Sequence, residues 1–289
     1  MKIVWDNSSL SGLCDRFIDL FLMAAMARVL SSELIVPWKI NRNFGERQLR
    51  VWDKARFDDY KYENFSQYFH LPNSVKVMTE EDFSQYDLTD HVYFSDYLGG
   101  IFTPTTFHQR HLGQICSFEA FDEAHRQVLA EFLPKQKLLD IIGQVPDLDL
   151  AIHLRRGDKV NENPNNVEIS NDALQDLDEM TKTCADKIVS RNEISYVFIC
   201  SDEESSTGEY EKRYSEMGHK IIKPSRSYTR IERTYVDLFL LSKAKTIVMS
   251  QRHSNFSLFA SQLHESKLVY FYPNNPMIND RISIFHKDV

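Results

Sequence analysis

The carboxyl half of the chain alternates short apolar runs with segments of helical periodicity, and this alternation restricts the fold more than any other feature. Runs that are apolar on consecutive residues are typical of strands buried on both faces of a parallel sheet, which needs crossover helices on those faces. We expect strands at residues 148–154, 196–200, 220–222, 246–249 and 268–271, and helices at 171–189, 209–217, 234–244 and 256–263. The pattern predicts an α/β fold with a doubly wound sheet.

The amino-terminal residues begin a second unit of the same kind. A strand, a turn containing Gly12, an apolar helical stripe and another strand are expected at residues 2–5, 6–14, 15–30 and 34–38, and together they predict a βαβ unit. A further strand at 74–78 and a helical stretch at 118–144, broken at Pro134, follow. Residues 145–147 form a predicted connector. We therefore expect two domains, 1–146 and 147–289.

Charge, cysteines and apolar runs exclude several classes of protein. The net charge of −8 argues against a nucleic-acid binder, because phosphate binding needs a basic field. The four cysteines have no CxxC spacing, which argues against structural zinc and a disulfide framework. No apolar run reaches the ~18 residues of a membrane span, and no signal peptide is recognisable. We expect a cytoplasmic protein without a transmembrane segment, and peripheral association with a membrane stays open.

Basic residues cluster where the strand at 148–154 ends. His153 and Arg155 lie on the same side of that strand, and Arg156 follows directly. Ligands bind beyond the carboxyl ends of strands in open parallel sheets, and guanidinium groups hold phosphate oxygens in pairs. The motif predicts a diphosphate site. The alternative is a surface loop in which Arg156 pairs with Asp158.

These residues also carry a family resemblance. The segment His153-Leu154-Arg155-Arg156-Gly157-Asp158-Lys159 resembles the H-x-R-R-x-D-K segment of the α1,6-fucosyltransferases and the related α1,2- and protein O-fucosyltransferases. Residues 196–203, 235–244, 246–257 and 11–16 are similar to further pieces of that family, in the same order, with Cys14 replacing a usual glycine. The resemblance covers the carboxyl half and the first forty residues. It implies a GT-B fold of two facing Rossmann-like domains, a donor bound mainly by the second domain, and no metal.

The resemblance implies roles for matching donor-site residues. Arg155 would hold the donor β-phosphate and stabilise the charge that develops on the leaving nucleotide. His153 and Asp237 would contact the nucleoside, with the carboxylate accepting hydrogen bonds from guanine, and Asp202 would lie near the base or ribose. The remaining donor-binding candidates are Gly12, Arg156 and one serine after the last matched strand, Ser250, Ser254 or Ser257.

The general base has more than one candidate. Asp158 and Lys159 would orient the loop and relay a proton. The α1,6 enzymes have a glutamate four positions after the lysine, whereas this chain has Asn163 there and Glu162 beside it. Glu162 therefore joins Arg155, Asp158 and Lys159 as a candidate catalytic residue.

Weaker motifs favour structural interpretations. The D-x-D spacings at residues 147–149 and 176–178 resemble those of metal-dependent transferases, but one precedes its strand and the other lies in a polar helix. We expect solvated acidic side chains and no metal site. Arg226, Arg230, Arg233, Arg252 and His253 would either enlarge a phosphate pocket or form a solvated basic face.

The predicted function is transfer of fucose from GDP-fucose to a hydroxyl of an oligosaccharide or glycolipid acceptor, with inversion, in the synthesis of a surface polysaccharide. One alternative keeps the fold and uses another nucleotide sugar. The other is a non-catalytic protein that binds GDP or a glycan, because a fold does not specify a function.

Overall fold

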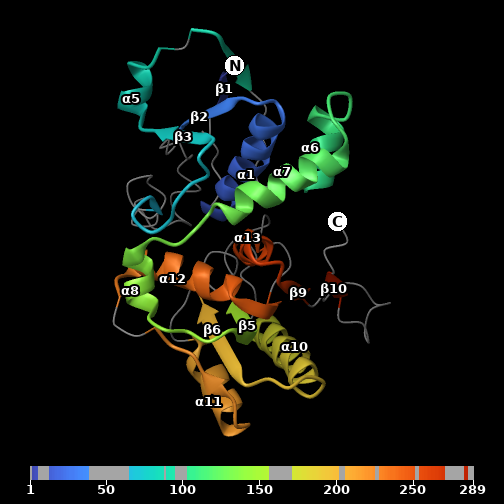
Figure 1. Ribbon diagram of the computed structural model, residues 1–289. Helices are drawn as coiled ribbons and strands as arrows, with labels where there is room; N and C mark the ends of the chain where they lie inside the picture. Colours follow the sequence, from blue (N-terminus) through green and yellow to red (C-terminus); the bar gives the residue numbers. More distant parts are fainter. Residues whose placement is uncertain are drawn as a thin grey trace. The chain divides into compact units, whose positions relative to one another are not determined.

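The computed structural model describes residues 2–5, 13–38, 65–87, 89–94, 103–155, 171–201, 206–224, 228–250, 254–270 and 283–285. The chain forms two compact units, Met1–Leu139 and Asp140–Val289, which divide slightly before the expected boundary at residue 146. Each unit is an α/β structure built on its own sheet (Figure 1). The predicted α/β class with two Rossmann-like sheets is confirmed.

The amino-terminal unit contains a parallel four-stranded sheet in the order β3-β2-β1-β4. Its strands are β1 (Lys2–Trp5), β2 (Glu33–Pro37), β3 (Val75–Met78) and β4 (His91–Phe94). Its helices are α1 (Leu13–Val29), α5 (Glu80–Ser84), α6 (Pro104–His111) and α7 (Phe118–Ala130), and α8 (Gln136–Ile142) spans the division between the units. The break expected at Pro134 separates α7 from α8.

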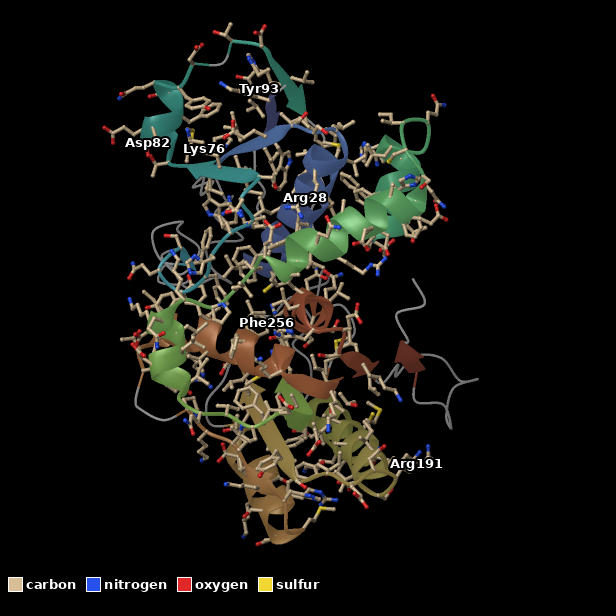
Figure 2. All side chains as sticks on the ribbon, viewed as in Figure 1. Arg28, Lys76, Asp82, Tyr93, Arg191 and Phe256 are labelled. Atoms are coloured by element: carbon tan, nitrogen blue, oxygen red, sulfur yellow. The ribbon has the colours of Figure 1, made fainter. Side chains whose placement is uncertain are left out.

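Aromatic side chains form much of the core around α1. The Phe17 ring lies 5.2 Å from that of Phe65 and 5.4 Å from that of Phe132, centroid to centroid. Such tilted and edge-on pairs add stabilisation beyond the burial of apolar surface. At the other end of α1, Arg28 pairs with Glu131, which follows α7 (Figure 2). These contacts hold α1 against α7.

The carboxyl-terminal unit contains a six-stranded sheet in the order β10-β9-β8-β5-β6-β7, parallel except for β10. Its strands are β5 (Leu148–Leu154), β6 (Tyr196–Ser201), β7 (Lys220–Ile221), β8 (Ala244–Met249), β9 (Lys267–Tyr270) and β10 (Ser283–Phe285). Its helices are α10 (Asn171–Val189), α11 (Gly208–Glu216), α12 (Arg230–Ser242) and α13 (Asn255–Leu263). All the predicted strands of this half are present.

Helices cover both faces of this second sheet. On one face, Leu150, Ile152 and Leu154 of β5 pack with Cys184 of α10 and Tyr214 of α11. Side chains alternate along a strand, so His153 points to the other face, where α12 and α13 pack together (Figure 1). This arrangement directs His153 and the residues after β5 toward α13.

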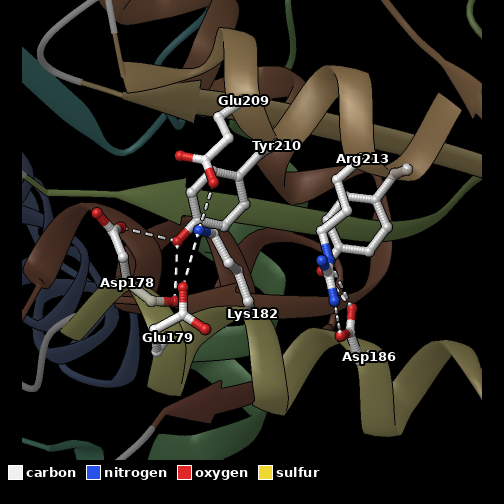
Figure 3. Close-up of polar contacts among 8 residues, drawn as sticks. Asp178, Glu179, Lys182, Asp186, Glu209, Tyr210 and Arg213 are labelled. Carbon is white, nitrogen blue, oxygen red and sulfur yellow. Dashed lines mark hydrogen bonds and ion pairs between the residues drawn. The ribbon is translucent and has the colours of Figure 1, made fainter. Parts of the chain in front are cut away.

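Polar contacts fix α11 on α10. Figure 3 shows the pairs Tyr210–Asp178, Lys182–Glu179, Lys182–Glu209 and Arg213–Asp186. The Tyr210 hydroxyl donates to the Asp178 carboxylate over 2.8 Å. Because these charges are already paired with one another, the cluster has a structural role. No helix in the described part of the chain is both long and apolar enough to cross a bilayer.

Candidate functional site

The strand order places a switch point between β5 and β8. From β5 the chain continues outward through β6 and β7 on one side, and later through β8 and β9 on the other. The helices that follow these strands, α10 after β5 and α13 after β8, pack on opposite faces of the sheet. In sheets of this kind, ligands bind beyond the carboxyl ends of the strands at the switch point.

Arg155 lies at this switch point, directly after β5. Its backbone N–H donates to the Ser250 hydroxyl over 2.9 Å, and the Ser250 N–H donates to the His153 carbonyl over 3.0 Å. Ser250 directly follows β8. These two bonds hold the ends of the neighbouring strands together and fix the backbone from which the Arg155 side chain extends.

His153 is buried beneath this point and is neutral. Its Nδ1 lies 2.7 Å from the Ser257 hydroxyl and 3.4 Å from the Ser254 hydroxyl. The Phe256 ring packs against the imidazole, with centroids 5.3 Å apart. Burial, and then the charge of Arg155, lower the pKa of His153 from 6.5 to about 3. At neutral pH the ring is therefore a hydrogen-bonding group without charge.

The first turn of α13 brings two of the predicted serines to His153. Ser254 is the N-cap residue of α13, yet its side chain makes no capping hydrogen bond to the helix. Ser257, in the same turn, is fully buried against His153. The positive end of the α13 dipole therefore lies beside the switch point, where an anion is stabilised. Of the three predicted phosphate-binding serines, Ser257 is already bonded to His153 at short distance. Ser250 and Ser254 therefore remain the candidates for binding phosphate.

Asp237 lies on α12, which packs over β5 and contacts both β6 and β8. The side chain is 13% exposed, and its Oδ2 lies 3.6 Å from Nε of Arg233. A second nitrogen of Arg233 donates to the carbonyl of Ser201, the last residue of β6, over 2.9 Å. This places Arg233 among buried polar partners and not on the solvated basic face that the sequence left open.

Arg233 had a detectable signal in the sequence. The helix was expected from residue 234, but α12 begins at Arg230, after a capping box formed by Thr229 and Glu232. Thr-x-x-Glu before an apolar run is a recognised helix start. Starting the helix there puts Arg233 and Asp237 four residues apart on one face.

The remaining predicted site residues lie outside the described ranges. They are Gly12, Arg156, Asp158, Lys159, Glu162 and Asp202. The structure brings together His153, Arg155, Ser250, Ser254 and Ser257, while Asp237 lies toward β6. The assignments of the general base and of the ribose contact stay predictions.

Two aspartates of the D-x-D segments, Asp149 and Asp178, are held by hydrogen bonds and are not the solvated side chains expected from the sequence. Asp149 accepts hydrogen bonds from the backbone N–H groups of Ser195 and Tyr196 and from Lys245. Burial alone would raise the pKa of Asp149, but these bonds outweigh it and lower the pKa. Asp178 accepts from Tyr210. Across the described ranges, no three histidine, cysteine or acidic side chains gather closely enough to hold a metal ion.

Comparison with known proteins gives structural matches only. No family model and no curated protein sequence matches the chain. The crystal structure of NodZ α-1,6-fucosyltransferase soaked with GDP-fucose matches over 99% of this chain and 98% of that chain, with a TM-score of 0.57 and 12% identity. Fucosyltransferase NodZ from Bradyrhizobium matches with a TM-score of 0.54, 14% identity and the same coverage. POFUT1 in complex with GDP matches over 93% of this chain and 98% of that chain, with a TM-score of 0.50 and 12% identity. The chain has the GT-B fold of these fucosyltransferases.

Proposed function

We propose that the chain is a fucosyltransferase that uses GDP-fucose. The observation that carries the proposal is Arg155 at the switch point of the second sheet, with its backbone bonded to Ser250 at the end of β8. The proposal gains support from the matching fold, because the matched NodZ and POFUT1 structures contain GDP-fucose or GDP. The carboxyl-terminal unit would bind the donor and the amino-terminal unit the acceptor.

The diphosphate would bind between Arg155 and the first turn of α13. A guanidinium group offers two parallel donors to phosphate oxygens, and the helix amino terminus adds backbone donors and a positive dipole. Neutral His153 adds a polar contact without a further positive charge. Asp237 would accept from the N1–H and exocyclic amine of guanine. No metal ion is required by this arrangement, since the protein supplies the positive charge.

The transfer forms one bond and breaks another at the anomeric carbon of fucose. An acceptor hydroxyl oxygen would attack that carbon while its bond to the β-phosphate oxygen breaks, which inverts the configuration and releases GDP. The hydroxyl proton passes to a base, for which Glu162 and Asp158 are the candidates. Negative charge grows on the leaving diphosphate, where the fixed Arg155 stabilises it. The acceptor would be an oligosaccharide or a glycolipid used in polysaccharide synthesis.

The test combines binding and turnover. Calorimetry should show GDP binding in the presence of EDTA, and binding of GDP should exceed that of UDP. Arg155→Lys keeps the charge but loses the planar pair of donors. We expect it to fold normally, to lose about a hundredfold or more in fucose transfer, equivalent to about 3 kcal/mol, and to lose less affinity for GDP.

The controls separate a lost contact from a lost fold. Arg213→Lys makes the same change in the same unit, at an arginine already paired with Asp186 on α10, and should leave turnover unchanged. Arg156→Lys is expected to be milder than Arg155→Lys. Near-normal turnover of Arg155→Lys would refute the proposed phosphate contact. Binding of GDP without transfer or hydrolysis of GDP-fucose in the wild type would favour a non-catalytic binding protein.

A further inference from the structure

We propose that Arg233 is a positioning residue that sets the guanine selectivity of the donor site by holding Asp237. The inference rests on the proposed function, in which Asp237 binds the base. It assigns a role to an arginine whose side chain lies between the end of β6 and α12, at 22% exposure.

The geometry shows one guanidinium bridging two elements. Its terminal nitrogen donates to the Ser201 carbonyl at the end of β6 over 2.9 Å, and its Nε lies 3.6 Å from Asp237 Oδ2. The planar guanidinium is rigid, so fixing one nitrogen on β6 also fixes the direction of the other. The position of the carboxylate is thereby tied to the carboxyl end of β6.

The capping box makes the helix side of this bridge rigid as well. The Thr229 hydroxyl accepts from the Glu232 N–H, and the Glu232 carboxylate accepts from the Thr229 N–H over 2.8 Å. Arg233 therefore extends from an ordered first turn. Less conformational entropy remains to be lost when a base binds, which favours affinity.

Pairing with Arg233 leaves Asp237 able to accept from a base. A carboxylate has four lone-pair sites in all, so the contact with Arg233 does not use up its capacity to accept hydrogen bonds. Guanine presents an N1–H and an exocyclic amine to such a pair of oxygens, whereas hypoxanthine presents only the N1–H. Recognition of the amine depends on how accurately the second oxygen is placed. Without Arg233 the carboxylate would be placed less accurately, and that distinction would weaken.

The experiment measures dissociation constants of GDP, IDP and UDP by calorimetry for the wild type and matched variants. Arg233→Met removes the whole guanidinium group at similar side-chain length, and Arg233→Lys keeps the charge but not the bridging fork. Arg213→Met is the control, because Arg213 bridges α11 to Asp186 on α10 and not to a base-binding carboxylate. Asp237→Asn and the double variant Arg233→Met with Asp237→Asn complete a thermodynamic cycle.

We expect the wild type to prefer GDP over IDP by about tenfold or more. Arg233→Met should remove most of this preference by weakening GDP more than IDP, Arg233→Lys should fall between, and Arg213→Met should retain the full preference. The double variant should show the same GDP-to-IDP ratio as Asp237→Asn alone. Melting temperatures identify any variant that fails to fold, in which case the lysine variant carries the comparison.

The possible failures are distinct. Equal binding of GDP, IDP and UDP by the wild type would refute the proposed guanine site itself. A wild type that prefers GDP, combined with an Arg233→Met variant that keeps the same ratio, would overturn the positioning role alone. Equal losses for GDP and IDP in Arg233→Met would likewise overturn it, because a purely structural bridge between α12 and β6 would act on both nucleotides.

Discussion

Replacing His153 with asparagine should reduce the loss of stability that acid causes in the carboxyl-terminal unit. His153 is 4% exposed, and burial followed by the charge of Arg155 lowers its pKa from 6.5 to about 3. In the unfolded chain the imidazole returns to its ordinary pKa of about 6.5. Asparagine does not titrate in this range, and its amide can place a polar atom near Ser257 in place of Nδ1.

The sign and size follow from the two pKa values. Between them the unfolded state binds a proton at His153 that the folded state does not bind, so acid favours unfolding. The contribution to stability is therefore complete above about pH 6.5 and is lost as the pH falls toward about 3. At pH 5 the unfolded pKa lies about 1.5 units above the solution pH, and at about 1.36 kcal/mol per unit the wild type should have lost about 2 kcal/mol relative to pH 7.

The assay is urea unfolding between pH 5 and pH 8, followed by both circular dichroism and tryptophan fluorescence. Trp5, Trp38 and Trp52 all lie in the amino-terminal unit, so a transition seen by circular dichroism and not by fluorescence belongs to the other unit. Subtracting the His153→Asn curve from the wild-type curve cancels the other titrating groups. Parallel pH dependences in the two proteins would show that His153 is protonated normally in the folded state, and the neutral buried imidazole would be refuted.

Three further changes test single contacts. Ser250→Ala removes the acceptor of the Arg155 N–H, and calorimetry should show GDP binding weakened several-fold, by about 1 kcal/mol, with little change in melting temperature. Asp149→Asn replaces the carboxylate that accepts from the N–H groups of Ser195 and Tyr196 with an amide, which accepts through only one of its two terminal atoms. The unfolding free energy should fall by about 1–3 kcal/mol while GDP affinity is retained. Tyr210→Phe deletes the bond to Asp178 and should lower the unfolding free energy by about 1 kcal/mol, again without an effect on GDP; a loss of GDP affinity there would contradict its structural role.

The second sheet could be predicted because its strands are buried on both faces. β5 is buried at every position, and its sequence is apolar apart from Asp149 and His153. Those two polar residues lie toward opposite ends of the strand, and each has hydrogen-bond partners from a neighbouring element. A strand with this pattern is read correctly from local sequence because burial and composition agree.

The amino-terminal unit was harder to predict because its edge elements are not fully buried. β4 is a four-residue edge strand whose Val92 and Tyr93 are 52% and 55% exposed, so its short apolar segment does not reflect burial on both faces. The start of α6 did have a signal, since Thr103 and Thr106 form a capping box around Pro104. Local capping chemistry would therefore have located α6 and the true start of α12, where apolar periodicity alone did not.

Which strand ends meet could not be read from local sequence, and the site depends on it. Arg155 and Ser250 are 95 residues apart in the sequence. They are in contact because β8 pairs with the edge of β5 opposite to β6, instead of adding to the sheet beyond β7. The same order gives β5 two different neighbours at its carboxyl end. On one side, β8 and α13 supply hydroxyl groups and a helix amino terminus, which suit a diphosphate. On the other side, β6 and α12 supply a carboxylate held by Arg233, which suits the hydrogen-bond donors of a base. Under the proposed function, a nucleotide lying across the end of β5 would thus meet phosphate-binding groups on one side and base-binding groups on the other. The reverse orientation would be disfavoured, because it would place the phosphates against the Asp237 carboxylate.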